Sequence, residues 1–296
     1  WYRAQPLLVG ANYNPASAIN QLEMWQEDTF DPDRIDLELG WAAAIGMNSM
    51  RVYLHNLLWE QDAGGFKNRL RRYLDIADSH GISTMFVLFD SVWDPHPVLG
   101  PQHRPTPGIH NSGWVQAPGA DRLADSSQYH LLEAYVRDIV GTFADDDRVV
   151  VWDVWNEPSN WGGGNYEPTP DKKELVANLL KLTFQWARAA KPTQPITSGV
   201  WIGDEWSILA ELPEIEQIQL LESDVISFHD YSWPEVFERR VNQLQPCGRP
   251  LLCTEYMARG NGSTFDNTLP LGKKYDVAMY NWGLVDGKTQ TRLPWD

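Results

Sequence analysis

The sequence has few cysteines and no long apolar run. Its 296 residues include only two cysteines, Cys247 and Cys253, which is too few for a disulfide framework and does not form a zinc-binding pattern. Cys253 lies in an apolar, strand-like run, so we expect it to be a buried free thiol. The longest apolar runs have the length of a strand, which argues against a transmembrane helix and against insertion into a membrane.

Basic residues are also scarce. Lys and Arg number 24 against 40 Asp and Glu, which gives a formal net charge of −16. Nucleic acid and anionic membrane surfaces are poor partners for such a chain, because phosphate groups are bound by a basic face. Tryptophan is abundant by contrast, with 15 residues, many of them in predicted loops. Some must serve packing alone, but tryptophans at one end of a barrel would also stack on sugar rings.

Apolar strand-like runs alternate with helical patterns along the whole chain. Such alternation predicts parallel strands joined by crossover helices, and no change in composition marks a linker. Eight strands in a chain of this length favour a closed barrel, so we predict the α/β class and a single (β/α)₈ (TIM) barrel over residues 1–296. The predicted strands are 7–11, 49–54, 82–89, 149–157, 195–200, 225–228, 250–254 and 277–282. The predicted helices are 32–45, 70–80, 132–140, 171–190, an irregular 204–223, 234–244 and 266–274.

The last strand is followed by only a short segment, residues 283–296, that has no helical pattern. We therefore expect the closing helix of the barrel to be absent or to lie beyond the end of this chain.

The longest irregular stretch runs from residue 91 to about residue 125 and is rich in Pro and Gly. A loop of this length inside a compact domain is usually a lid or a binding loop. It carries Trp93 and three histidines, but prolines interrupt it and no helical face aligns the histidines. A metal site is therefore not expected at His96, His103 and His110.

The fourth predicted strand ends in an amide, a carboxylate and a proline, Asn156-Glu157-Pro158. Pro158 cannot continue the ladder, so the strand stops there. Burying a carboxylate at a strand end costs free energy unless it has a partner or a function there. Polar side chains also end the other strands, and a parallel barrel brings such residues together at one site. The set comprises Asn12, Arg51, His55, Asp90, Asn156, Glu157, His229, Tyr231, Glu255 and Trp282.

Two of these side chains, Glu157 and Glu255, are carboxylates on nonadjacent strands. With an arginine, a tyrosine and an asparagine around them, they supply the groups needed for retaining glycoside hydrolysis. Two carboxyl groups about 5 Å apart cannot both ionise easily, so the pKa of one is raised. A guanidinium favours the charged form of the glutamate that it touches. The glutamate that Arg51 touches would therefore be the ionised nucleophile, and the other would be the protonated acid.

The motifs Trp155-Asn156-Glu157-Pro158, Thr254-Glu255-Tyr256 and His229-x-Tyr231, together with Arg51 and Trp282, resemble clan A glycoside hydrolases, most closely family 5-like enzymes of the cellulase superfamily. The resemblance covers essentially the whole chain, strand by strand. It implies a retaining O-glycosyl hydrolase that acts by double displacement and needs no metal or organic cofactor.

The resemblance also implies roles for single residues. Glu157 is similar to the acid/base and Glu255 to the nucleophile of these enzymes. Asn156 resembles the residue that holds the sugar 2-hydroxyl next to the scissile bond.

Four further residues resemble supporting groups of the family. Tyr231 resembles the tyrosine that hydrogen-bonds the nucleophile, and Arg51 the arginine that keeps it ionised. His229 resembles a histidine near the acid/base, and Trp282 the platform beneath the sugar in the −1 subsite.

Several other residues belong to the expected substrate-binding set. Asp90 and His55 would either orient their neighbours or touch substrate. Trp93 follows the third strand, and we expect about half of Trp93, Trp114, Trp161 and Trp201 to line the cleft. Asp153 points into the barrel by strand parity and needs a buried partner. Arg51 could be that partner, which would compete with its role beside Glu255.

The expected substrate is a β-linked oligo- or polysaccharide of the glucan, mannan or xylan type. The sequence leaves open which sugar is bound, whether cleavage is endo or exo, and the oligomeric state. Secretion or export to the periplasm fits such a substrate, although the chain carries no visible signal peptide. Two alternatives remain: a catalytically inactive sugar-binding barrel, and a metal-dependent barrel hydrolase that uses His55, Asp90, His229 and a glutamate.

Overall fold

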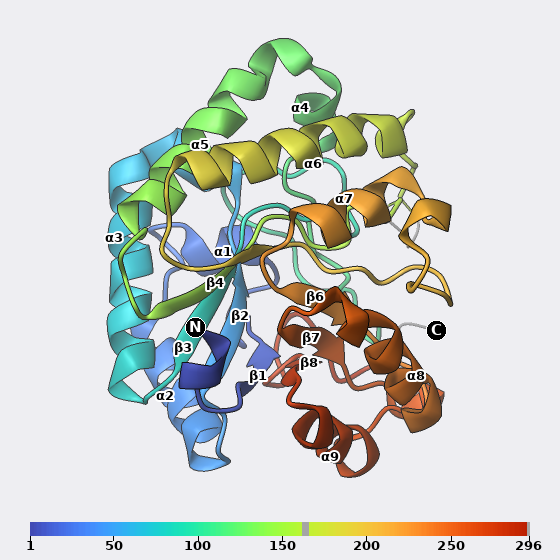
Figure 1. The fold of residues 1–296 in the computed structure, drawn as a ribbon. Coiled ribbons are helices and arrows are strands. Elements are labelled where there is room, and N and C mark those ends of the chain that lie inside the picture. Colours follow the sequence, from blue (N-terminus) through green and yellow to red (C-terminus); the bar gives the residue numbers. More distant parts are fainter. Residues whose placement is uncertain (162–165, 295–296) are drawn as a thin grey trace.

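The computed structural model describes residues 1–161 and 166–294 and folds as a barrel of eight parallel strands surrounded by helices (Figure 1). The strands are β1 Val9–Asn12, β2 Ser49–Tyr53, β3 Ser83–Val87, β4 Val149–Asp153, β5 Ile196–Thr197, β6 Ile226–His229, β7 Leu251–Tyr256 and β8 Ala278–Trp282. Their order is β5-β4-β3-β2-β1-β8-β7-β6. The predicted (β/α)₈ fold is confirmed.

The barrel closes between β5 and β6 through one isolated bridge, Val200 to Phe228. Only Ile196–Thr197 is a regular strand in the segment predicted as 195–200. Side-chain hydrogen bonds replace part of the missing ladder there, since Thr197 Oγ1 donates to the carbonyl of Val225 at 2.8 Å. The fifth strand is thus the shortest and the least regular of the barrel.

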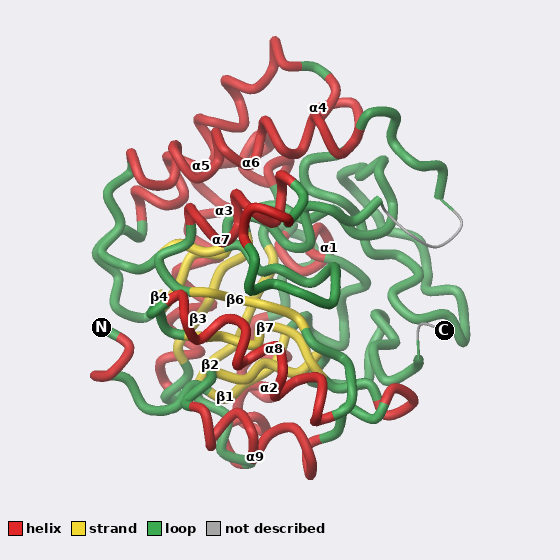
Figure 2. The backbone as a smooth tube through the Cα atoms, turned by 45° about the vertical axis from the view of Figure 1, so that its right-hand side comes forward, coloured by secondary structure: helices red, strands yellow, loops and turns green. Residues whose placement is uncertain are grey.

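The helices cover the outside of the strands, and long loops gather on one side of the barrel (Figure 2). The bounds are α1 Gln21–Trp25, α2 Pro32–Ala44, α3 Asn56–Ser79, α4 Ala120–Ala124, α5 Tyr129–Thr142, α6 Lys172–Ala189, α7 Glu214–Glu222, α8 Pro234–Leu244 and α9 Phe265–Tyr275. No helix follows β8 within residues 283–294, as expected. The last two residues of the chain lie outside the described part.

The helix α3 begins at Asn56, well before the predicted start at residue 70. His55 caps it, because its Nδ1 accepts a hydrogen bond from the backbone of Leu57 at 3.1 Å. Asp62, with φ −157°, kinks the helix shortly before two consecutive glycines. The kink and the glycines interrupt the helical pattern of the sequence, so the first half of this helix was not predicted.

The largest side chains of the core fill the space between strands and helices. The rings of Trp25 and Tyr73 pack edge to face with their centroids 5.5 Å apart. The ring of Phe86 packs against that of Trp152 with a centroid distance of 5.8 Å. Inside the barrel the N-terminal ends of the strands contribute apolar side chains. The fully buried Arg51 and Asp153 belong to the polar part, which lies toward the carboxyl ends.

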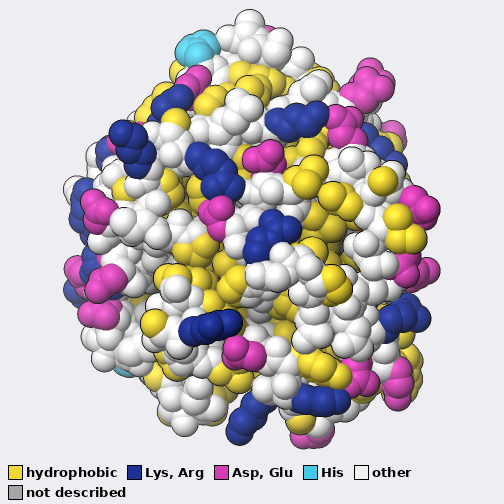
Figure 3. Space-filling model, viewed as in Figure 1, with side chains coloured by type: hydrophobic (Ala, Val, Ile, Leu, Met, Phe, Trp, Pro, Cys, Tyr) yellow, Lys and Arg dark blue, Asp and Glu magenta, His cyan; other side chains and the backbone are white. Residues whose placement is uncertain are grey.

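The other expectations from composition can be compared with the structure. Both cysteines are free thiols, and Cys253 is buried as predicted. Among the described residues, no helix has the length and apolarity needed to cross a bilayer. On the face drawn in Figure 3, Lys and Arg side chains are scattered among acidic ones and form no continuous basic surface.

The close approach of β1 to β2 gives a test of this packing. Gly10 pairs with Ser49, and a Cβ at Gly10 would lie 1.6 Å from the Ser49 carbonyl oxygen. We expect Gly10→Ala to lower the free energy of unfolding by at least about 2 kcal/mol, because two backbones would have to separate.

Gly141→Ala is the matched control. Gly141 is exposed on α5, and its added Cβ would meet only Ala190, at 3.9 Å. This substitution should stabilise by about 0.5–1 kcal/mol through helix propensity. Urea unfolding measures both, and equal midpoints for Gly10→Ala and the unmodified protein would contradict the packing described.

Candidate active site

Glu157 stands on the loop that leaves β4, in a strained backbone conformation. Its φ of +44° lies in the left-handed region, which residues with a side chain seldom adopt and which often marks a functional position. The carboxylate is held by two neighbours. Oε1 lies 2.9 Å from His229 Nδ1, and Oε2 accepts a hydrogen bond from Asn160 Nδ2 at 2.8 Å.

Glu255 lies within β7 and accepts three hydrogen bonds. Its Oε1 receives Arg51 Nη1 at 2.8 Å and the Tyr53 hydroxyl at 2.9 Å, and its Oε2 receives the Tyr231 hydroxyl at 2.6 Å. Burial raises the pKa of Glu255, but the charges of His229 and Arg51 and the two tyrosine hydroxyls outweigh burial and hold the pKa below its ordinary value. Glu255 is therefore the carboxylate that stays ionised.

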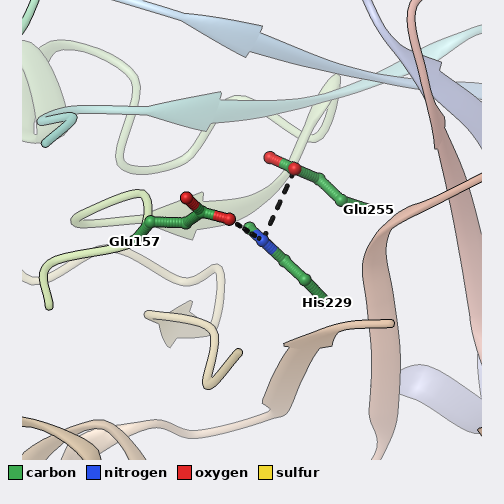
Figure 4. Close-up of side chains that lie close together, drawn as sticks. All are labelled: Glu157, His229 and Glu255. Atoms are coloured by element: carbon green, nitrogen blue, oxygen red, sulfur yellow. Dashed lines mark hydrogen bonds and ion pairs between the residues drawn. The ribbon is translucent and has the colours of Figure 1, made fainter. Parts of the chain in front are cut away.

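The two glutamates face each other across His229 (Figure 4). His229 Nδ1 lies 2.9 Å from Glu157 and 3.5 Å from Glu255. One oxygen of each carboxylate and a ring nitrogen of His229 all lie within 4.8 Å of one another. Retaining glycosidases separate their carboxyl groups by about 5–5.5 Å, and inverting enzymes by about 6.5–9.5 Å. The observed spacing fits retention.

Arg51 joins most of the site through one buried guanidinium. It donates twice to Asp153 Oδ2, from Nε at 3.1 Å and from Nη2 at 2.7 Å. It also donates to Asn12 Oδ1 and to Asn156 Oδ1, each at 2.8 Å. Because separate nitrogens serve Asp153 and Glu255, the expected competition between these two partners does not arise.

Asn156 is held in one orientation from both ends of its amide. Arg51 donates to its oxygen, and its Nδ2 donates to Asp90 Oδ1 at 2.9 Å. Asp90 also accepts from Trp114 Nε1 at 2.6 Å. Burial raises the pKa of Asp90 to about 7 although these hydrogen bonds oppose the shift. Asp90 thus orients Asn156 and Trp114.

Four residues of the expected substrate-binding set, Arg51, His229, Asp90 and His55, do not line the cleft. Asp90 and His55 contact neighbouring residues instead, which is the first of the two roles expected for them. Asp90 lies behind Asn156 and Trp114, as described above. His55 is fully buried, and its Nε2 lies 3.0 Å from the carbonyl of Gln116 while its Nδ1 caps α3. Burial lowers the pKa of His55 to about 3. A neutral imidazole in this position ties α3 to the long loop.

The cleft at the carboxyl ends of the strands has a volume of about 230 Å³. It is lined by Val92, Trp93, His110, Asn111, Trp114, Asn156, Glu157, Asn160, Trp201, Tyr231, Glu255 and Trp282. Three of the four candidate loop tryptophans, Trp93, Trp114 and Trp201, therefore line it. The fourth, Trp161, is exposed and lies beneath the Lys173 ammonium. Arg51 and His229 act from behind the lining through their contacts with the glutamates.

Sequence reasoning missed several contributors. Tyr53 follows Arg51 by two residues on β2, so strand parity could have placed it on the same face. His110, Asn111 and Asn160 stand in loops without any periodicity, and no signal in the sequence marks them.

The donor atoms of Glu157, His229 and Glu255 are close enough to touch a single cation. The set considered for a metal-dependent hydrolase is not assembled, however, because His55 and Asp90 are engaged elsewhere. Among the described residues no other cluster of three such ligands occurs.

Comparisons with known proteins agree with this geometry. The family model for cellulase (glycosyl hydrolase family 5) matches residues 42–287. A search of curated protein sequences finds no significant match.

Solved structures share the fold at low identity. The exo-β-1,4-mannosidase Op5Man5 from Opitutaceae bacterium strain TAV5 is 18% identical, with a TM-score of 0.64 over 94% of this chain and 51% of that chain. The endo-1,4-β-mannanase from Eisenia fetida is 13% identical, with a TM-score of 0.65, and the match covers 97% of this chain and 90% of that chain. The endo-1,4-β-mannanase from Rhizomucor miehei is 14% identical, with a TM-score of 0.62, and the match covers 94% of this chain and 86% of that chain. This chain spans about half the length of Op5Man5, and at such identities the likeness shows the fold alone.

The hydroxyl of Tyr231 is one of the groups that keep Glu255 ionised, so Tyr231→Phe should raise the pKa of Glu255. Since the nucleophile must be charged, the acid limb of the pH profile of kcat/KM should move to higher pH. We also expect the maximal kcat/KM to fall about 100-fold. Tyr129→Phe, which removes a hydroxyl bound to the carbonyl of Leu123, is the control and should leave the profile unchanged. An unmoved acid limb in Tyr231→Phe would contradict the role given to this hydroxyl.

Proposed function

Because the chain belongs to glycosyl hydrolase family 5, the cellulase family, we propose that it hydrolyses β-glycosidic bonds with retention of anomeric configuration. The family inferred from the strand-end motifs is thereby confirmed. One observation carries the proposal for this chain. An oxygen of Glu157 and an oxygen of Glu255 lie within 4.8 Å of each other in the cleft, and the charges of His229 and Arg51 and the hydroxyls of Tyr231 and Tyr53 hold the pKa of Glu255 below its ordinary value.

In the first step, Glu255 attacks the anomeric carbon of the sugar and forms a glycosyl ester. Arg51, Tyr53 and Tyr231 hold its two oxygens in place, so little reorganisation is needed as the bond forms. Glu157 donates its proton to the glycosidic oxygen, which leaves as an alcohol.

In the second step, Glu157 removes a proton from a water molecule. This water attacks the anomeric carbon, and Glu255 departs as a carboxylate. Asn156 uses one N–H for Asp90, which leaves its second N–H to donate to a sugar hydroxyl beside the scissile bond. Since Asp90 and Arg51 fix this amide, the hydrogen bond to substrate carries little entropic cost.

The substrate proposed is a β-linked oligo- or polysaccharide, with mannan-type chains first among the glucan, mannan and xylan types. The tryptophans in the cleft supply flat apolar faces suited to sugar rings. Two of the compared enzymes are named mannanases and one a mannosidase, which supports this order. A panel of aryl β-glycosides and polysaccharides, with product configuration followed by NMR, tests the activity. Inverted products, or no turnover of any member, would overturn it.

Substitution of each glutamate distinguishes the two roles. We expect Glu255→Gly to lower kcat by at least about 10⁴-fold, because no covalent intermediate can form. Azide should then rescue turnover by entering the vacated space and give the α-glycosyl azide. Glu157→Ala should lose activity mainly on substrates with poor leaving groups, and its reaction with azide should give the β-glycosyl azide.

The products decide between the assignments. Exchanged anomers would reverse the roles of the two glutamates, and full activity of Glu157→Ala would remove it from the mechanism. The same assays discriminate against an inactive sugar-binding barrel, which would bind oligosaccharides without turnover.

Chelation addresses the metal-dependent alternative. The mechanism above uses no cation, so incubation with EDTA followed by dialysis should leave kcat/KM on an aryl β-glycoside unchanged. Loss of activity that Zn²⁺ or Mn²⁺ restores would favour a metal held by Glu157, His229 and Glu255 instead.

A further inference from the structure

Trp282 is the last residue of β8 and resembles the platform beneath the sugar in the −1 subsite. It lines the cleft, and so does His110, which belongs to the long loop after β3. The two side chains are in direct contact, because Trp282 Nε1 lies 3.1 Å from His110 Nε2. A loop histidine without a role in the mechanism above therefore touches the residue expected to carry the sugar.

The partners of the two ring nitrogens decide where His110 carries its proton. An indole N–H can only donate a hydrogen bond, so His110 Nε2 is the acceptor and holds no proton. His110 Nδ1 lies 2.7 Å from the carbonyl oxygen of Leu293, which can only accept, so Nδ1 is protonated. The imidazole is therefore neutral. An imidazolium would turn a second N–H toward the indole N–H and break the contact with Trp282.

The surroundings of His110 favour this neutral form. The side chain is 7% exposed, and burial lowers the pKa of the imidazole, although the carbonyl of Leu293 and the charge of Glu255 oppose the shift. The ring thus keeps the unprotonated nitrogen that the indole requires.

Hydrogen bonds from a distant segment hold the loop around His110. The side chain of Gln290 donates to the carbonyls of Thr106 and Ile109 at 2.7 and 2.8 Å, and the carbonyl of Leu293 binds the imidazole itself. The C-terminal end of the chain and the long loops lie on the same side of the barrel (Figure 2). The position of His110 is therefore set by the folded chain before any substrate binds.

Two other aromatic side chains pack against Trp282. Tyr53 and Trp114 meet its ring edge to face, each with ring centroids 6.0 Å apart. Edge-to-face packing favours this tilt of the rings, but it does not fix the direction of the indole N–H. The hydrogen bond to His110 supplies that direction. Tyr53 also donates to Glu255 at 2.9 Å, so the same cluster relates the indole to the nucleophile.

We propose that His110 is a positioning residue for the sugar platform, whose unprotonated Nε2 holds the indole of Trp282 in the orientation that receives the sugar. With its N–H engaged, the indole has no further polar group and offers the cleft apolar ring atoms. A sugar then meets a fixed flat surface, and little freedom is lost when it binds. This inference rests on the proposed function, because it requires a glycosidic substrate.

Nitrogen-15 NMR of the imidazole and indole side chains tests the contact without an activity assay. At neutral pH we expect His110 to show a protonated Nδ1 and an unprotonated Nε2, with a scalar coupling across the N–H···N bond to the indole nitrogen of Trp282. Spectra of His110→Leu and Trp282→Phe assign the two signals. A proton on Nε2, or an indole signal of Trp282 that stays unchanged in His110→Leu, would overturn the proposal.

Substitutions of His110 test its effect on turnover. His110→Leu leaves the indole N–H without its partner, so we expect kcat/KM on the best aryl β-glycoside to fall about 5- to 100-fold. His110→Gln should remain within about threefold of the unmodified enzyme, because its amide oxygen can accept from the indole. His130→Leu, at an exposed position on α5, is the control and should keep full activity. Equal losses in His110→Leu and His110→Gln would contradict the role as acceptor.

A double substitution separates the positioning of Trp282 from a general effect on the fold. Trp282→Phe lacks the indole N–H, so adding His110→Leu should cause no further fall in kcat/KM. A further fall as large as that of His110→Leu alone would show that His110 acts on something else and would overturn the proposal. Inactivity of the unmodified enzyme on every substrate would instead count against the proposed function, whereas the NMR spectra decide on the contact independently.

Discussion

The site depends on one buried guanidinium. Arg51 is fully enclosed and donates to the carboxylates of Asp153 and Glu255 and to the amide oxygens of Asn12 and Asn156. A charge in this position is tolerated only because its partners surround it, and loss of a partner from such a pair costs about 3–5 kcal/mol. The same contacts that make Arg51 stable also keep Glu255 ionised and Asn156 correctly turned. The contacts that fill the polar interior of the barrel are therefore also the contacts that hold Glu255 and Asn156.

The two glutamates differ because their surroundings differ. Glu255 lies in β7, where the pairing with both neighbouring strands shifts register, and it receives donors on both oxygens. Glu157 stands on a strained loop beside His229 and Asn160. Two carboxyl groups this close favour one negative charge over two. Arg51, Tyr53 and Tyr231 bind that charge on Glu255. His229, Arg51, Tyr231 and Tyr53 together lower the pKa of Glu255 against the opposing effect of burial.

The residues at the strand ends could be predicted from the sequence because a parallel barrel brings the carboxyl ends of all its strands together at one site. Alternation and β-branched runs located the eight strands, and the barrel then fixed that Glu157 and Glu255 meet. Helix caps are harder to recognise in a sequence. The role of His55 therefore stayed open between orienting its neighbours and touching substrate, whereas in the structure it caps the N-terminus of α3 and contacts the carbonyl of Gln116. Loop residues follow no period: His110 and Asn111 reach the cleft only because a distant segment holds them. Such contacts depend on the folded chain, and composition or spacing does not encode them.

The central claim is that Glu255 forms the covalent bond with the sugar. Incubation with a 2-deoxy-2-fluoro-β-glycosyl fluoride slows release of the intermediate, because the fluorine destabilises the positively charged transition state. Mass spectrometry of the intact protein and of its proteolytic peptides then locates the adduct. The account predicts one fluoroglycosyl group per chain, on Glu255. An adduct on Glu157, or hydrolysis with inversion and no adduct, would contradict it.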